Sequence, residues 1–158
     1  MWLLWVFLSL IAVTWLYKKS KSAPAQTPSQ AACLPPGAAG RLVGPGTFTY
    51  NVRGEFAYQD ELCEVTGTEP EEDFEKSVTS TLVYEDENEH DPMAVRVEIG
   101  GYRVGYLSRE DARSYRKQLK AKGAAGAKLA CEGKITTEYN DIDAEWQFEV
   151  WLDLPVNE

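Results

Sequence analysis

The sequence has few of the residues that build disulfide frameworks and metal centres. Among 158 residues there are three cysteines and one histidine. Cys33, Cys63 and Cys131 are far apart and show no Cys-x-x-Cys spacing. An odd and scattered set of thiols argues against a disulfide framework and against a zinc site. Reduced thiols of this kind are consistent with a cytosolic domain.

Motifs of the common enzyme classes are also missing. No Gly-x-Ser-x-Gly turn is present to expose a nucleophilic serine, and His90 is the only histidine that would serve as its base. No glycine-rich phosphate loop of the P-loop type occurs. Nothing around Cys63 favours an activated thiolate. The sequence therefore predicts a protein that is not an enzyme, with no cofactor and no metal.

Positive charge is scarce in most of the chain. The net charge is −9, but residues 1–45 hold four basic residues and no acidic one, so residues 46–158 carry all 25 acids against 12 bases, a net of −13. Non-specific binding to nucleic acid depends on Lys and Arg side chains that neutralise phosphates. A general duplex-coating protein is therefore excluded, whereas a local pocket for a short strand is not.

There is one long hydrophobic run, WLLWVFLSLIAVTWLY at residues 2–17, which has no charged residue. A helix of that length spans about 24 Å at ~1.5 Å per residue, which is short for a hydrocarbon core of ~30 Å. Tryptophan and tyrosine near both ends suit the membrane interfaces, and three lysines follow the run directly. We predict a single-pass transmembrane anchor at 1–17, with the rest of the chain in the cytoplasm.

The alternative for this run is a cleaved signal peptide, which would make the domain a secreted one. Such a peptide needs basic residues before its apolar stretch, and none precedes Trp2. After the anchor, residues 18–46 contain five prolines with many alanines, serines and glycines. That composition is typical of a flexible linker.

Residues 47–158 have the patterns of a folded domain. Alternating segments predict about six strands, and helical spacing predicts two helices. Gly100-Gly101 is a hairpin signal, and Ser108 with Asp111 resembles a capping box. We expect an α+β or mostly β domain that forms a partly open barrel. The predicted strands lie near residues 48–52, 78–84, 94–99, 102–107, 128–137 and 145–154, and the helices at 57–66 and from 108 onward.

Four segments in order resemble the HIRAN family. They are GEFAYQDEL at 54–62, LVYEDENEHDPMAVRV at 82–97, GGYRVGYLSREDARSY at 100–115 and FEVWLDLP at 148–155. The family pattern Asn-x-x-Asp-x-x-Ala-Val-x-Val matches from Asn88 to Val97, and its Val-Gly-[Tyr/His]-Leu pattern matches at residues 104–107. The resemblance covers nearly the whole folded part, residues 47–155.

The resemblance implies an OB-like β-barrel with helical additions that binds the 3′ end of single-stranded DNA. Some members are small bacterial proteins that consist of little else. No ATPase motor is present here, so a remodelling activity is not implied. Carried over by motif, the nucleic-acid-binding candidates are Phe56, Tyr58, His90, Asp91, Tyr106 and Arg109.

Other interpretations of these residues remain open. Asp91 before Pro92 is a good turn former, and the tyrosines are equally suited to a core or to a sheet face. Glu55 and Phe56 stand where DNA-binding members have a basic residue. Together with the net charge of −13, this favours a second hypothesis, a protein–protein interaction module that keeps the fold and has lost DNA binding.

Overall fold

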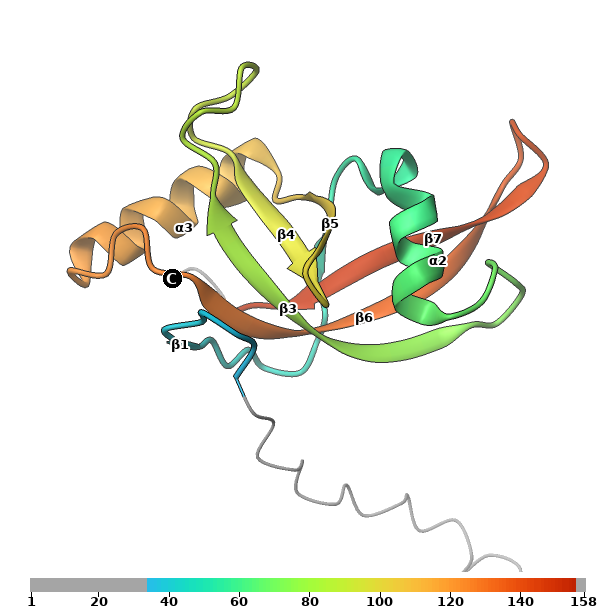
Figure 1. The fold of residues 1–158 in the computed structure, drawn as a ribbon, viewed down its shortest axis with the longest axis horizontal. Coiled ribbons are helices and arrows are strands. Elements are labelled where there is room, and N and C mark those ends of the chain that lie inside the picture. The colour runs from blue at the N-terminus through green and yellow to red at the C-terminus, as the bar shows by residue number, and fades with distance from the viewer. Residues whose placement is uncertain (1–33, 156–158) are drawn as a thin grey trace, which may run out of the picture. The chain divides into compact units, whose positions relative to one another are not determined.

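A computed structural model describes residues 34–155 (Figure 1). The predicted anchor at 1–17 and the first part of the predicted linker lie outside the described residues. Within residues 34–155, no helix combines the length and the apolar character needed to cross a bilayer.

One curled sheet organises the described part of the chain (Figure 1). Its strands follow the order β2-β7-β6-β3-β4-β5, with antiparallel pairing throughout, and β1 pairs with β6 in parallel. The sheet forms a half-barrel that is consistent with an OB-like β fold, as predicted. The strands are β1 (Gly40–Arg41), β2 (Tyr50–Asn51), β3 (Glu75–Tyr84), β4 (Val95–Ile99), β5 (Tyr102–Tyr106), β6 (Leu129–Asn140) and β7 (Glu145–Asp153).

The two edges of the sheet meet just after β2. Arg53 donates its backbone N–H to the carbonyl of Tyr106 at 2.7 Å and accepts the N–H of Tyr106 at 2.9 Å. Gly105 permits this approach, because a Cβ at that position would lie 2.5 Å from the side chain of Val52. The contact fixes Tyr106 close to the helical turn that follows Arg53.

Helices occupy opposite ends of the sheet in Figure 1. A short 3-10 helix, η1 (Glu55–Tyr58), leads into α2 (Gln59–Thr66), which ends at Gly67 with a φ of 78°. This confirms the helix predicted at 57–66. The second predicted helix is α3 (Arg109–Ala121), where the Ser108 side chain accepts the N–H of Asp111 as the capping signal indicated.

The core lies between the concave face of the sheet and the helices. Alternation buries Val95, Val97 and Ile99 along β4, and α3 contributes a face that contains Tyr115 and Leu119. Residues from Leu34 onward form a unit with its own core, as independently folding domains do.

The structure corrects the predicted linker in the part that it describes. Residues 34–46 lie against the sheet, where β1 pairs with β6 and Leu42 packs on the core. The buried carboxylate of Asp153 accepts the N–H groups of Gly46 at 2.8 Å and Thr47 at 3.2 Å. The ordered domain therefore includes residues 34–46, and the predicted strand at 48–52 is reduced to Tyr50–Asn51.

Candidate functional site

A hollow of about 330 Å³ opens where the β3–β4 loop, the end of β5 and the start of α3 meet. Its volume falls in the range of ~300–1,000 Å³ that is typical of small-ligand pockets. Five of the six predicted binding residues line it: Tyr58, His90, Asp91, Tyr106 and Arg109. We call this hollow the tyrosine–aspartate pocket.

The β3–β4 loop that holds Asp91 is braced by its own side chains. Asn88 donates its amide to Glu85 at 2.7 Å, and its oxygen accepts the backbone N–H groups of His90 at 2.9 Å and Asp91 at 3.1 Å. Asp91 Oδ1 accepts the N–H of Met93 at 2.9 Å. The predicted turn-forming role of Asp91 is therefore present, and it occupies only one of the two carboxylate oxygens.

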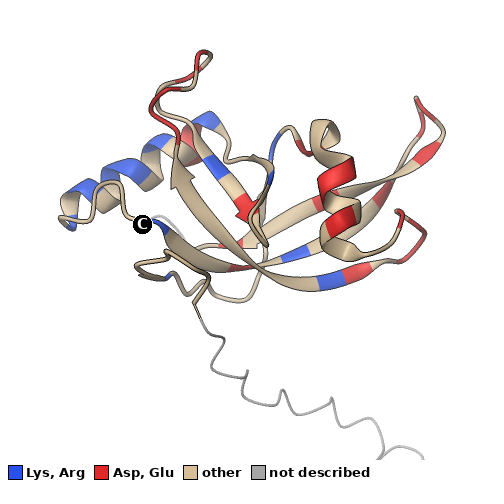
Figure 2. Ribbon diagram, viewed as in Figure 1, with Lys and Arg blue, Asp and Glu red and all other residues tan. Residues whose placement is uncertain are grey.

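The second oxygen, Asp91 Oδ2, faces two arginines of α3. It lies 3.7 Å from Arg109 Nε and 3.7 Å from Arg113 Nη2. These separations exceed hydrogen-bond length, so each pair is a loose ion pair. The Arg109 and Arg113 side chains are 73% and 56% exposed, whereas that of Asp91 is 14% exposed. The pocket thus has a sheltered carboxylate and a solvent-facing basic rim on α3 (Figure 2).

The phenol groups of the pocket belong to a polar cluster. Arg103 donates to the Tyr106 hydroxyl at 3.0 Å and pairs with Glu85 at 3.2 Å. Burial, together with hydrogen bonds to Glu85 and Tyr58, raises the pKa of Tyr106 to about 12. Both phenols are hydrogen-bonded within this cluster, which fixes where their rings lie.

Glu85 is the acceptor that holds this cluster together. Burial would raise the pKa of its carboxyl, but hydrogen bonds from Asn88 and Tyr106 and the charge of Arg103 outweigh burial and lower that pKa. Glu85 stays ionised at neutral pH and accepts from several donors at once. Because its negative charge is paired with Arg103 and its oxygens accept these hydrogen bonds, Glu85 repels an anionic ligand less than an unpaired glutamate would.

Phe56 is not part of the tyrosine–aspartate pocket. Its ring is 73% exposed and lines a different hollow with Glu138 and Glu149. The 3-10 turn of η1 accounts for the difference, because residues two apart in such a turn do not share a face as they do in a strand. Of the six candidates named from the motif resemblance, the structure therefore brings five to one hollow and places Phe56 at another.

Sequence reasoning missed several residues at the pocket. Leu107 and Ala112 supply apolar wall, Asn88 lines the same hollow, and Arg113 joins the basic rim. Arg113 had an available signal, because it stands one helical turn after Arg109. Glu85 had none, since it follows β3 and its contact with Tyr106 joins it to β5, and the contact of Arg103 with Tyr58 joins β5 to η1.

No family model, no curated protein and no solved structure matches this chain. Among residues 34–155, no group of three or more His, Cys, Asp or Glu side chains is placed to hold a metal ion. The chemistry of the pocket is therefore read from its own side chains.

Proposed function

We propose that the folded domain is a HIRAN-like module with an OB-like barrel, and that it captures the 3′ end of single-stranded DNA. The supporting observation is that Tyr58, His90, Asp91, Tyr106 and Arg109 line one hollow. These side chains come from three separate stretches of sequence, and the fold brings them to one place. Their types are the ones that a strand terminus requires.

Four of these five side chains, those of Tyr58, Asp91, Tyr106 and Arg109, have a defined role in this proposal. The rings of Tyr58 and Tyr106 stack on bases, which contributes ~1–3 kcal/mol per base in comparable sites. Asp91 Oδ2 accepts a hydrogen bond from the terminal 3′-hydroxyl, a donor that an internal nucleotide lacks. Arg109 and Arg113 contact the neighbouring phosphate. A 3′-phosphate would bring negative charge toward Asp91 and is disfavoured.

The proposal is tested by fluorescence anisotropy with residues 34–158 and a 5′-labelled oligonucleotide that ends in a 3′-hydroxyl or a 3′-phosphate. We expect tighter binding of the hydroxyl form and loss of that preference in Asp91→Asn. Asp73→Asn is the matched control, since Asp73 is exposed on a loop outside the pocket. Equal binding of both oligonucleotides by the unchanged protein, or binding of neither, would refute the proposal.

A second candidate function is a protein–protein interaction module with the same fold and no nucleic-acid affinity. The observation that favours it is the net charge of −13 over residues 46–158. Long-range repulsion of this kind slows the approach of any polyanion. A pull-down from native membranes that recovers proteins and no nucleic acid would support this candidate over the first.

We further propose that residues 2–17 tether the domain to a membrane and that the domain faces the cytoplasm. The support is the uncharged aromatic-flanked run followed by three lysines. In right-side-out vesicles, the domain is expected to resist added protease. Its digestion from outside would reverse the orientation, and a mature N-terminus beyond residue 17 in mass spectrometry would replace the anchor with a signal peptide.

A further inference from the structure

A second hollow, of about 370 Å³, lies between η1 and the β6–β7 hairpin, away from the tyrosine–aspartate pocket. Its apolar side chains include two that are open to solvent, Phe56 at 73% and Ile142 at 92% exposure. Tyr139 adds a third exposed side chain, whose ring packs edge-on against Trp146 at 5.4 Å. We call this hollow the hairpin groove.

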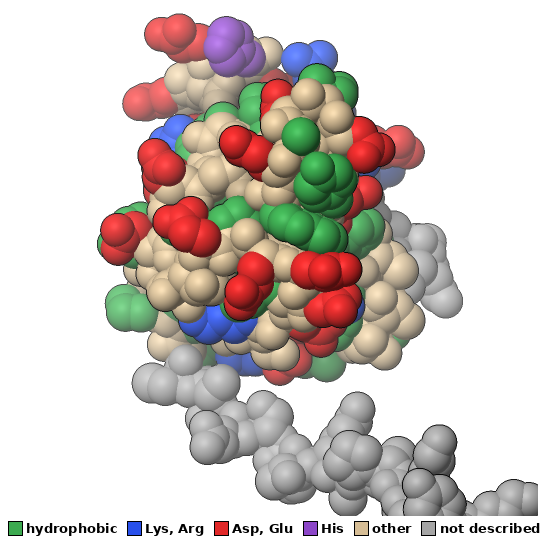
Figure 3. All heavy atoms as spheres, turned by 90° about the vertical axis from the view of Figure 1, so that its right-hand side faces the viewer, with side chains coloured by type: hydrophobic (Ala, Val, Ile, Leu, Met, Phe, Trp, Pro, Cys, Tyr) green, Lys and Arg blue, Asp and Glu red, His purple; other side chains and the backbone are tan. Residues whose placement is uncertain are grey.

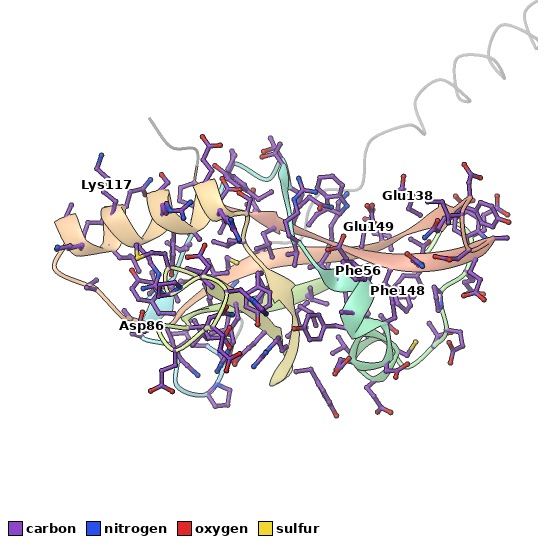
Figure 4. The ribbon with its side chains drawn as sticks, turned by 90° about the horizontal axis from the view of Figure 1, so that it is seen from above. Phe56, Asp86, Lys117, Glu138, Phe148 and Glu149 are labelled. Carbon is purple, nitrogen blue, oxygen red and sulfur yellow. The ribbon has the colours of Figure 1, made fainter. Side chains whose placement is uncertain are left out.

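Exposed side chains of this size are costly to leave in water when they gather around one concave site. Single exposed apolar residues are normal, but a cluster with acidic neighbours marks an interaction surface. Figure 3 shows such a face, with hydrophobic side chains surrounded by acidic ones. In Figure 4, Phe56 lies beside Glu149 at the part of the sheet that also carries Phe148.

The charged side chains that line the hairpin groove are all acidic. Residues 55–75 and 138–149 contain 14 of the 25 acidic residues and no Lys or Arg. Hydrogen bonds hold the two segments together. Gln59 exchanges two with the backbone of Phe148, at 2.8 and 3.0 Å, and Thr137, just before the second segment, donates to the carbonyl of Glu71 at 2.6 Å. The acids therefore form one region of the surface, which Figure 2 shows at the end opposite α3.

Four carboxylates line the groove itself, those of Glu55, Glu138, Asp141 and Glu149. Burial, followed by the neighbouring Glu138, raises the pKa of Glu149, so negative charge is already crowded there. Phosphate groups are repelled from such a site, whereas a cationic side chain relieves the crowding.

We infer that the hairpin groove docks a partner protein through a short segment in which Lys or Arg residues alternate with large apolar residues. The apolar side chains of that segment cover Phe56 and Ile142, and its cations meet the acidic rim. Charge complementarity selects this occupant over a nucleic acid. The inference concerns a different surface from the tyrosine–aspartate pocket and holds whatever that pocket binds.

The probe is a labelled 12-residue peptide of alternating Arg and Leu, titrated into residues 34–158 and followed by fluorescence anisotropy. Two control peptides replace every Arg with Glu or every Leu with Ser. We expect binding of the first peptide alone, and at least tenfold weaker binding to Ile142→Ser. Val43→Ser is the matched control, because Val43 is an exposed valine outside the groove, and it should leave the affinity unchanged.

Glu138→Gln tests the charge in the same assay and should weaken peptide binding at least threefold, while oligonucleotide binding at the other pocket is kept. Equal peptide affinity for Ile142→Ser, Glu138→Gln and the unchanged protein would overturn the inference, because only diffuse charge attraction would then remain. Sedimentation velocity supplies another decisive outcome. Self-association of the unchanged domain that disappears in Ile142→Ser would identify a second copy as the occupant and refute a foreign segment.

Discussion

At the residue scale, the tyrosine–aspartate pocket depends on side chains that already have structural partners. Asp91 uses one oxygen for the loop and presents the other toward α3. Tyr106 gives its hydroxyl to a cluster with Glu85 and Arg103, and its ring lines the hollow. Each side chain is held by its polar partner while one ring face or one carboxylate oxygen is left for a ligand. Such preorganisation lowers the entropic cost of binding.

The raised pKa of Tyr106 makes a prediction about alkaline pH. Folding favours its neutral phenol, with a pKa of about 12 against a value of 10.0 for an ordinary tyrosine. Its contribution to the free energy of unfolding is therefore complete below about pH 10 and is lost as pH rises through 12. Absorbance titration of the phenolates in Tyr106→Phe should lack a component near pH 12 that the unchanged domain shows. An identical titration curve for both proteins would contradict this assignment.

At the element scale, the predictions from the sequence that the structure confirms rest on short-range patterns. The Ser108 cap, the Gly100-Gly101 turn and the alternation along β4 each involve residues within a few positions of one another. Both turn glycines have positive φ, 61° and 92°, as a two-residue hairpin of the primed type requires. Short-range interactions of this kind favour the same helix cap, turn or strand regardless of which distant strand lies next to it.

The misassigned elements depend on distant partners. Residues 34–46 have the composition of a linker, and only their contacts with β6 and Asp153 give them a fixed place. The direction of the Phe56 ring is likewise set by how η1 packs on β7. No periodicity within either segment encodes these long-range contacts, so pattern reasoning missed both. The grouping of residues 58, 90–91 and 106–109 came from the motif resemblance alone, because no pattern within one segment relates these three stretches.

The close contact of Gly105 with Val52 and Arg53, where the two edges of the sheet meet, predicts the effect of a substitution on stability. An added Cβ would meet the Val52 side chain at 2.5 Å and the Arg53 carbonyl at 2.7 Å, at a φ of +140° that favours glycine. Gly105→Ala should therefore lower the free energy of unfolding by about 2 kcal/mol or more, since overpacking alone costs ~1–3 kcal/mol. Urea unfolding measures the change. Gly40→Ala is the control, because its Cβ would make only an ordinary 3.5 Å contact with Leu129; an equal loss in both variants would argue against the closure.

On the scale of the whole molecule, the bases of α3 lie away from the acidic region, although the β3–β4 loop beside α3 also carries Asp86, Glu87 and Glu89 (Figure 2). The exposed bases of α3 border the tyrosine–aspartate pocket, and the acidic region surrounds the hairpin groove. A negatively charged strand and a positively charged protein segment would thus approach different surfaces of the domain. Electrostatic steering of this kind governs association rates and partner choice more than affinity itself. The two proposed sites are therefore compatible on one small domain.

The same charge imbalance predicts how the stability of the domain responds to salt. A net charge of −13 over residues 46–158 repels itself in the compact state. The Debye length falls from ~30 Å at 0.01 M to ~3 Å at 1 M ionic strength, so added NaCl screens this repulsion. Urea unfolding should therefore give a higher free energy of unfolding at 0.5 M than at 0.02 M NaCl. The double variant Glu71→Gln and Glu72→Gln, which neutralises two exposed acids of the acidic region, should show a smaller increase. If added salt lowers the free energy of unfolding instead, the attraction in ion pairs such as Arg96 with Glu85 and Glu98 outweighs the repulsion. The acidic region would then not destabilise the domain, and a basic partner would relieve no repulsion by binding there.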